Sequence, residues 1–207
     1  MTPIVVRLIA ALSALFVLVG CGGDGSASSD ATGDPKIPET PVITGTPAGY
    51  NAADIAFAET MVPHHAQAID LSTMASERST NPELIALAGQ IVATHQPEVN
   101  ILNVFLVQWN ENPDARTDPD TGDDPLEPSI PGMVDDATVA RLESLRGPEF
   151  DKLWLQSMLG QLQGGVVIAD DEVADGANVD AIALAKAIKS GLESQIAQTK
   201  QMLEGLP

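Results

Sequence analysis

The chain repeats itself at a spacing of 97 residues, and this internal repeat limits the folds that are open to it. The two halves align without a gap, and the following like residues coincide: Asp54 and Asp151, Phe57 and Trp154, Met61 and Met158, Asn81 and Asn178, Leu87 and Leu184, Ile91 and Ile188. Each half has the pattern of two helices. Because a duplicated helical hairpin commonly forms a four-helix bundle, we predict an all-α fold made of two repeated hairpins.

The first helix carries a stripe of residues that should be buried. They recur at spacings of four and three, which places them on one helical face: Phe57, Met61, His64, Ala68, Leu71 and Ala75. Asn81-Pro82 marks the start of the second helix, with an N-cap followed by proline in the first turn. Pro97 lies inside the second helix, and we expect it to kink that helix or to end it and begin another.

The second hairpin has matching boundaries. Its first helix should begin at Gly147, and Asn178 should cap its second helix. A short extra helix is expected ahead of this hairpin, over about residues 136–145. Gly164-Gly165 should weaken the third bundle helix, since each glycine in a helix interior costs up to about 1 kcal/mol.

The first twenty residues have the features of an export signal. Arg7 is their only charge, and the apolar run at residues 8–19 is shorter than the roughly 20 residues that span a bilayer. The run ends in Leu-Val-Gly-Cys at residues 18–21, which resembles a bacterial lipobox. We therefore expect residues 1–20 to be a lipoprotein signal peptide. Lipidated Cys21 would anchor the protein to the extracytoplasmic side of the cell membrane. An ordinary secreted protein with an incidental cysteine is the alternative.

The composition then changes twice along the chain. Residues 21–50 are rich in small and polar residues, so we expect a disordered tether, and residues 51–207 should form the bundle domain. Residues 110–131, rich in Asp, Pro and Gly, should be an acidic connector between the hairpins. The net charge of −19 should repel nucleic acid.

Histidines give the clearest indication of chemistry, because the chain has only three of them. His64 and His65 follow Met61 by one helical turn, and His95 and Glu98 are one turn apart on the second helix. If the register of the hairpin brings these groups together, the candidate metal ligands are Met61, His64, His65, His95 and Glu98. Thioether and imidazole ligands favour copper over magnesium or calcium. The alternatives are a core-filling methionine and plain hydrogen bonds of the histidines.

These residues belong to a longer pattern, which consists of Met61-x-x-His64-His65-x-x-Ala68-Ile69, Glu98-Val99, Gly132-Met133, Gly147-x-x-Phe150-Asp151 and Met158. The pattern resembles the bacterial family known as domain of unknown function 305, over about residues 53–206. The resemblance implies a ferritin-like four-helix bundle that is commonly exported. Some relatives are described as copper-binding, which implies a copper or other metal role here.

The second half departs from that family pattern. Family members usually repeat the histidine pair, whereas this chain has Gln161 and Leu162 at those positions. The equivalents of His95 and Glu98 are Leu192 and Gln195. We therefore expect at most one lopsided site, formed by the first half and completed by Met158 or Gln161.

Two functions follow from these patterns. The first is an envelope-anchored metal-binding lipoprotein, with copper as the ion, that acts in sequestration or tolerance and is not an enzyme. The alternative is a non-catalytic scaffold or partner-binding lipoprotein whose metal site has decayed. A di-iron oxidase is disfavoured, because the inward-facing residues lack the paired Glu-x-x-His motifs of such bundles.

Overall fold

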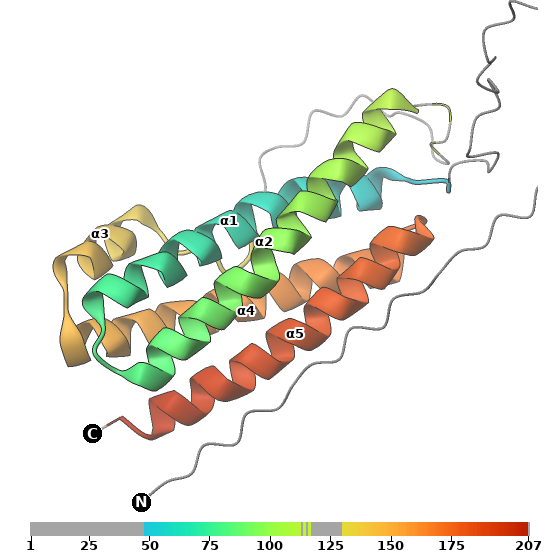
Figure 1. The fold of residues 1–207 in the computed structure, drawn as a ribbon. Helices are drawn as coiled ribbons and strands as arrows, with labels where there is room; N and C mark the ends of the chain where they lie inside the picture. The colour runs from blue at the N-terminus through green and yellow to red at the C-terminus, as the bar shows by residue number, and fades with distance from the viewer. Residues whose placement is uncertain (1–47, 113, 115, 117–129, 207) are drawn as a thin grey trace, which may run out of the picture. The chain divides into compact units, whose positions relative to one another are not determined.

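The computed structural model describes residues 48–112, 114, 116 and 130–206, and all five helices of this part are shown in Figure 1. They are α1 (Ala52–Arg78), α2 (Pro82–Glu111), α3 (Asp136–Ser144), α4 (Gly147–Asp175) and α5 (Val179–Glu204). Helices α1 and α2 form one hairpin and α4 and α5 the other, while α1 and α4 join the hairpins. The predicted all-α bundle of two hairpins, with a short helix before the third, is confirmed.

Helix starts agree with the sequence repeat. The side chain of Asn81 accepts hydrogen bonds from the backbone N–H groups of the second and third residues of α2. Asn178 makes the same two bonds at the start of α5. Such N-caps satisfy backbone donors that have no partner inside the helix. The two halves therefore begin their second helices by the same local device.

The bundle core contains the predicted stripe of α1, all of whose residues are buried. The Trp154 indole of α4 donates a hydrogen bond from Nε1 to the backbone oxygen of Leu71, at 2.8 Å. Met61 and Met158, which are equivalent in the repeat, are both fully buried. Helices α1 and α4 thus pack against each other, and each has a buried methionine at the equivalent position.

Neither prolines nor glycines interrupt the helices. Helix α2 runs through Pro97, so the expectation that a helix ends there is wrong. The Gly164-Gly165 pair lies inside continuous α4 and serves close packing. A Cβ at Gly164 would lie 2.1 Å from the backbone oxygen of Pro131, and one at Gly165 would lie 2.9 Å from Cε1 of His64. These glycines therefore let the connector and a histidine ring approach the helix.

The chain at and just after the end of the predicted connector lies against both hairpins, with Pro131 at Gly164 of α4 and Val134 at Gln67 of α1. Gln67 of α1 donates to the backbone oxygen of Val134 and accepts from its N–H, both at 2.8 Å. Helix α2 extends to Glu111, two residues into the predicted connector. At the other boundary, Tyr50 is buried and stacks on Trp109, so the packed domain includes the last residue of the predicted tether.

Other predictions fall on residues that the structure does not describe. They are the signal peptide at residues 1–20, Cys21, nearly all of the tether, and residues 113, 115 and 117–129 of the connector. Within the described part, no helix has the length and apolar character needed to cross a membrane.

Candidate metal centre

The first hairpin brings two histidines and a glutamate together in its interior. His65 of α1 and His95 and Glu98 of α2 each offer a ligand atom, and these atoms lie within 4.8 Å of one another. Nε2 of His65 is 3.0 Å from Oε2 of Glu98. The rings of His65 and His95 stack, with centroids 4.0 Å apart and an angle of 14° between planes. The register of the hairpin thus places these three side chains at one point.

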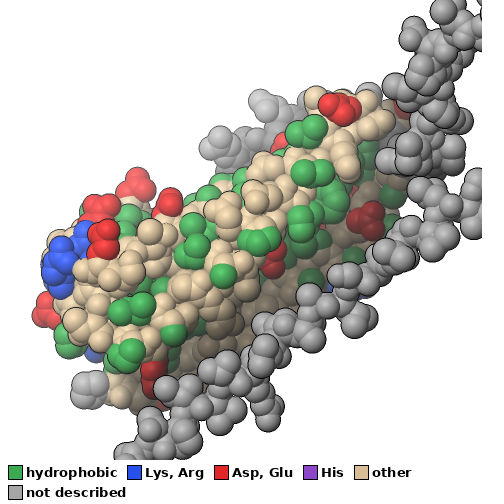
Figure 2. Space-filling model, viewed as in Figure 1, with side chains coloured by type: hydrophobic (Ala, Val, Ile, Leu, Met, Phe, Trp, Pro, Cys, Tyr) green, Lys and Arg blue, Asp and Glu red, His purple; other side chains and the backbone are tan. Residues whose placement is uncertain are grey.

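Both histidines of this cluster are almost completely buried, whereas Glu98 is partly exposed. The relative exposure of His65 is 0% and that of His95 is 1%, while the Glu98 side chain keeps 21%. Figure 2 accordingly shows no histidine on the face of the described bundle that it presents. Glu98 is therefore the member of the cluster that faces the solvent.

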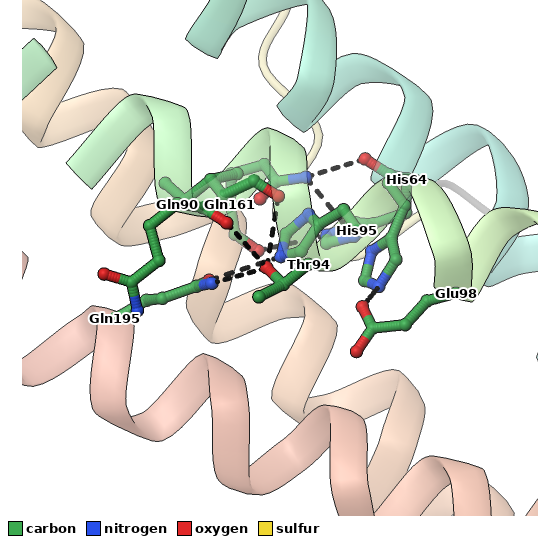
Figure 3. A network of polar contacts seen from close by, with 9 residues as sticks. His64, Gln90, Thr94, His95, Glu98, Gln161 and Gln195 are labelled. Carbon is green, nitrogen blue, oxygen red and sulfur yellow. Dashed lines mark hydrogen bonds and ion pairs between the residues drawn. The ribbon is translucent and has the colours of Figure 1, made fainter. Parts of the chain in front are cut away.

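Helix α5 of the second hairpin also contributes to the cluster (Figure 3). Oε1 of Gln195 lies 3.2 Å from Nε2 of His95, and Nε2 of Gln195 donates to Oγ1 of Thr94 at 3.1 Å. Sequence comparison identified Gln195 only as the repeat equivalent of Glu98. The contact joins residues 100 positions apart, so no local pattern could reveal it.

His64 belongs to a separate hydrogen-bonded pair with Gln161 of α4, its own repeat equivalent (Figure 3). Nε2 of His64 donates to the backbone oxygen of Gln161 at 3.0 Å. The amide nitrogen of Gln161 lies 3.3 Å from Nδ1 of His64 and donates to the His64 backbone oxygen at 2.7 Å. Both ring nitrogens of His64 therefore have partners, and the predicted plain hydrogen-bonding role describes this histidine.

The other two histidines differ, since each has one nitrogen without a partner. Nδ1 of His65 and Nδ1 of His95 are buried and make no hydrogen bond. A buried polar atom left in this state costs about 1–3 kcal/mol. An ionised carboxylate can only accept, so the Nε2–H of His65 donates to Glu98 and Nδ1 of His65 keeps its lone pair. Two unpaired imidazole lone pairs thus lie in one buried cluster.

Burial keeps all three imidazoles neutral around pH 7. It is the main cause that lowers the pKa of His65 to about 4 and that of His95 to about 3. For His95, the charge of His65 lowers the pKa further, while Glu98 and Gln195 oppose the shift. Burial, together with the charge of His65, also lowers the pKa of His64 to about 4. Burial raises the pKa of Glu98. Metal ligation needs neutral imidazole, so these shifts favour it.

Of the five predicted ligands, the structure groups His65, His95 and Glu98. Met61 lies one turn before the histidine pair and is fully buried in the core. His64 faces α4, and its ring centroid is 6.0 Å from that of His65. Sequence reasoning missed Gln195 as a direct partner of His95 and Thr94 as the partner of Gln195, and the only signal for Gln195 was its place in the repeat.

The grouped residues fit a transition-metal ion. Neutral imidazole suits copper and zinc, and one carboxylate offsets the positive charge of the ion. Without a metal, the two buried Nδ1 atoms have no partner. An ion bound here would accept both lone pairs and so supply the missing partner. Among the residues described, this is the one group of three such side chains that could hold a metal.

The fold and the site together define a class of protein. It is a helical bundle of two related hairpins, one of which holds a buried cluster of two histidines and a glutamate. The chain belongs to the DUF305 family, a domain of unknown function whose family model matches residues 54–203. No curated protein matches the chain.

Solved structures agree with this assignment. A DUF305 protein from Streptomyces coelicolor is 28% identical, with a TM-score of 0.64, over 74% of this chain and 93% of the other. A DUF305 fragment from Deinococcus radiodurans is 26% identical, with a TM-score of 0.63, over 78% and 100% of the two chains. CopM in a silver-bound form is 25% identical, with a TM-score of 0.57, over 73% and 96%. CopM has also been solved with Cu(II) and with Cu(I).

Proposed function

We propose that this protein binds copper through His65, His95 and Glu98. The observation that carries the proposal is the pair of buried Nδ1 atoms without hydrogen-bond partners, beside a carboxylate. The structural similarity to CopM, which binds Cu(I), Cu(II) and silver ions, supports copper as the ion. The neutral imidazoles also support it, because protons do not compete for them around pH 7.

The cellular role that we propose is copper sequestration or tolerance at the envelope. Burial of both histidines suits a site that holds an ion away from solvent, and we propose no catalytic role. Lipidated Cys21 would hold the protein on the extracytoplasmic side of the cell membrane, as the lipobox-like residues 18–21 indicate. The copper ion and the membrane are then its partners.

A scaffold with a decayed metal site is the alternative. The second hairpin supports it, since Gln161, Leu162, Leu192 and Gln195 replace potential ligands there. The first hairpin argues against it, because a decayed site has no need of two buried nitrogens without partners. A scaffold would keep its membrane partners when the histidines are replaced, which crosslinking and pull-down would show.

Titration of the purified protein with Cu(I) and Ag(I) against a competing chelator tests copper binding. We expect saturation at one ion per chain, and loss of saturable binding in His65→Ala and in His95→Ala. Binding that is absent from the wild type, or unchanged in both variants, would refute the proposal.

His64 supplies the matched control for that titration. It is the adjacent histidine, equally buried, but both its ring nitrogens are engaged by Gln161. We expect His64→Gln to bind the ion as the wild type does. Circular dichroism would show that each variant keeps its helices.

Fractionation of cells tests the anchor separately. The wild type should be recovered in membranes and Cys21→Ala in the soluble fraction. Equal distribution of the two proteins would exclude lipidation as the anchor.

A further inference from the structure

We infer that Thr94 and Gln195 are positioning residues that hold His95 in one tautomer, with the proton on Nε2, so that Nδ1 is the atom that binds the ion. This inference rests on the proposed copper site. It adds a role for the second hairpin, which otherwise has no part in the site. The contacts that carry it form a chain from α2 to α5 and back to α2 (Figure 3).

The chain begins at the backbone of α2. The Thr94 hydroxyl donates toward the backbone oxygens of Gln90 and Ile91, at 3.0 and 3.1 Å. Its single hydrogen is thereby used, and the hydroxyl oxygen is left as an acceptor. Oγ1 of Thr94 consequently faces Gln195 as an acceptor.

The next contact orients the amide of Gln195. Its nitrogen donates to Oγ1 of Thr94 at 3.1 Å, so its oxygen points to Nε2 of His95, 3.2 Å away. An amide oxygen can only accept, and Nε2 must carry the proton. In the opposite tautomer, the lone pair of Nε2 would face a lone pair of the Gln195 amide oxygen. The proton would then be on Nδ1, where the N–H has no partner.

Glu98 contacts the imidazole of His65 in the same way as Gln195 contacts that of His95. Oε2 of Glu98 accepts from Nε2 of His65, whose Nδ1 also has no partner. Glu98 and Gln195 occupy equivalent positions in the repeat, 97 residues apart. One ancestral position thus supplies both acceptors: the copy in the first hairpin orients His65, and the copy in the second orients His95.

Groups that orient a metal-binding histidine through its second nitrogen affect affinity without touching the ion. Replacing them typically weakens metal binding by about 10–100-fold. Gln195→Leu removes the acceptor at nearly constant volume, whereas Gln195→Glu keeps an acceptor toward His95. We expect weaker Ag(I) and Cu(I) binding by about 10–100-fold in the first variant and near wild-type binding in the second.

The decisive readout is the tautomer of His95 in the metal-free protein, measured by long-range ¹H–¹⁵N correlation in labelled chain. We expect the Nε2–H form in the wild type and in Gln195→Glu, and a mixture of tautomers in Gln195→Leu. Thr94→Val should also give a mixture, because the amide of Gln195 loses its orienting acceptor. Gln198→Leu, one turn further along α5, is the control and should change neither tautomer nor affinity.

The results separate the two proposals. An Nδ1–H tautomer in the wild type, or an unchanged tautomer in Gln195→Leu, would overturn the positioning role whatever the metal does. A Gln195→Leu variant that has mixed tautomers but full affinity would also overturn it. Absence of metal binding in the wild type would refute the proposed function, while the tautomer measurement would still report on the contacts.

Discussion

The two hairpins share a scaffold but differ in what they place at equivalent positions. The first has His64, His65, His95 and Glu98, and the second has Gln161, Leu162, Leu192 and Gln195. All of the second set except the leucines are hydrogen-bonded to histidines of the first, Gln161 to His64 and Gln195 to His95. The comparison teaches that the second hairpin places hydrogen-bond partners of histidines where the first has candidate ligands, so that the candidate metal centre draws on both halves through Gln195.

The largest expected effect is the creation of a second site in the second hairpin. Leu162 and Leu192 are buried at the positions equivalent to His65 and His95. We expect Leu162→His combined with Leu192→His to raise the Ag(I) stoichiometry from one to two ions per chain, measured by calorimetric titration. Leu162→His alone is the control and should leave it at one. A doubly substituted protein that stays helical and still binds one ion would show that the two hairpins are not interchangeable.

The next effect concerns the contact between the halves at His64 and Gln161. Either residue replaced by alanine leaves a buried polar partner unsatisfied, and we expect the free energy of unfolding to fall by about 1–3 kcal/mol. The melting temperature should fall by roughly 2–4 °C per kcal/mol. The double variant should lose less than the sum of the two, by at least about 0.5 kcal/mol, because the residues share one interaction. Additive losses in thermal melts would contradict the pairing.

Two glycines of α4 should change the stability of the protein in opposite directions when each is replaced by alanine. A Cβ at Gly164 would meet the backbone of Pro131 and Gly132, whereas one at Gly160 would meet nothing within 4 Å. Gly164→Ala should destabilise the protein by about 1–3 kcal/mol through overpacking. Gly160→Ala should stabilise it by up to about 1 kcal/mol through helix propensity. Denaturant unfolding would measure the free energy of unfolding of both variants. A change in the same direction in both would refute the role of close packing at Gly164.

The smallest expected effect is a pH dependence of stability that comes from Glu172. The first hairpin has Ala75 at the equivalent position. Glu172 is buried beside Asp54, whose oxygens accept from the backbone N–H groups of Asn51, Ala177 and Asn178. Burial, with the charge of Asp54 beside it, raises the pKa of Glu172 from 4.5 to about 8. Between these pH values the folded state binds more protons than the unfolded state. Stability from this group is therefore complete below pH 4.5 and is lost as the pH rises through 8.

Glu172→Gln removes that titration and offers Asp54 an amide donor. Above pH 8 we expect a gain of about 1 kcal/mol, or roughly 2–4 °C in melting temperature. Below pH 4.5 the difference should vanish. A melting-temperature difference that does not change with pH would show that Glu172 does not titrate in this range.

Most of the fold could be predicted from the sequence, because helices depend on local patterns. The buried stripe of α1 follows from residues three and four apart, and the caps Asn81 and Asn178 act on backbone groups within three residues. Pro97 could not be judged in this way, since the bundle keeps α2 helical through it.

The orientation of the histidines was harder to predict. His64 lies on the apolar stripe and His65 one residue to the side, yet both are fully buried. Helix α1 contacts α2 on one side and α4 on another, so it has two buried faces. His65 faces α2 and the other candidate ligands, whereas His64 faces α4. A single periodicity cannot say which neighbour each buried face meets.

The sequence by itself determined the helical class, the repeat and the residue types available for metal binding. Each of these can be recognised from spacings of a few residues or from the alignment of the two halves. Only the tertiary structure decided which of those residues meet. Contacts such as His95 with Gln195 span 100 residues, and they depend on the register at which whole helices pack. That register follows from the sum of many core contacts, so it is a property of the assembled bundle and of no single motif.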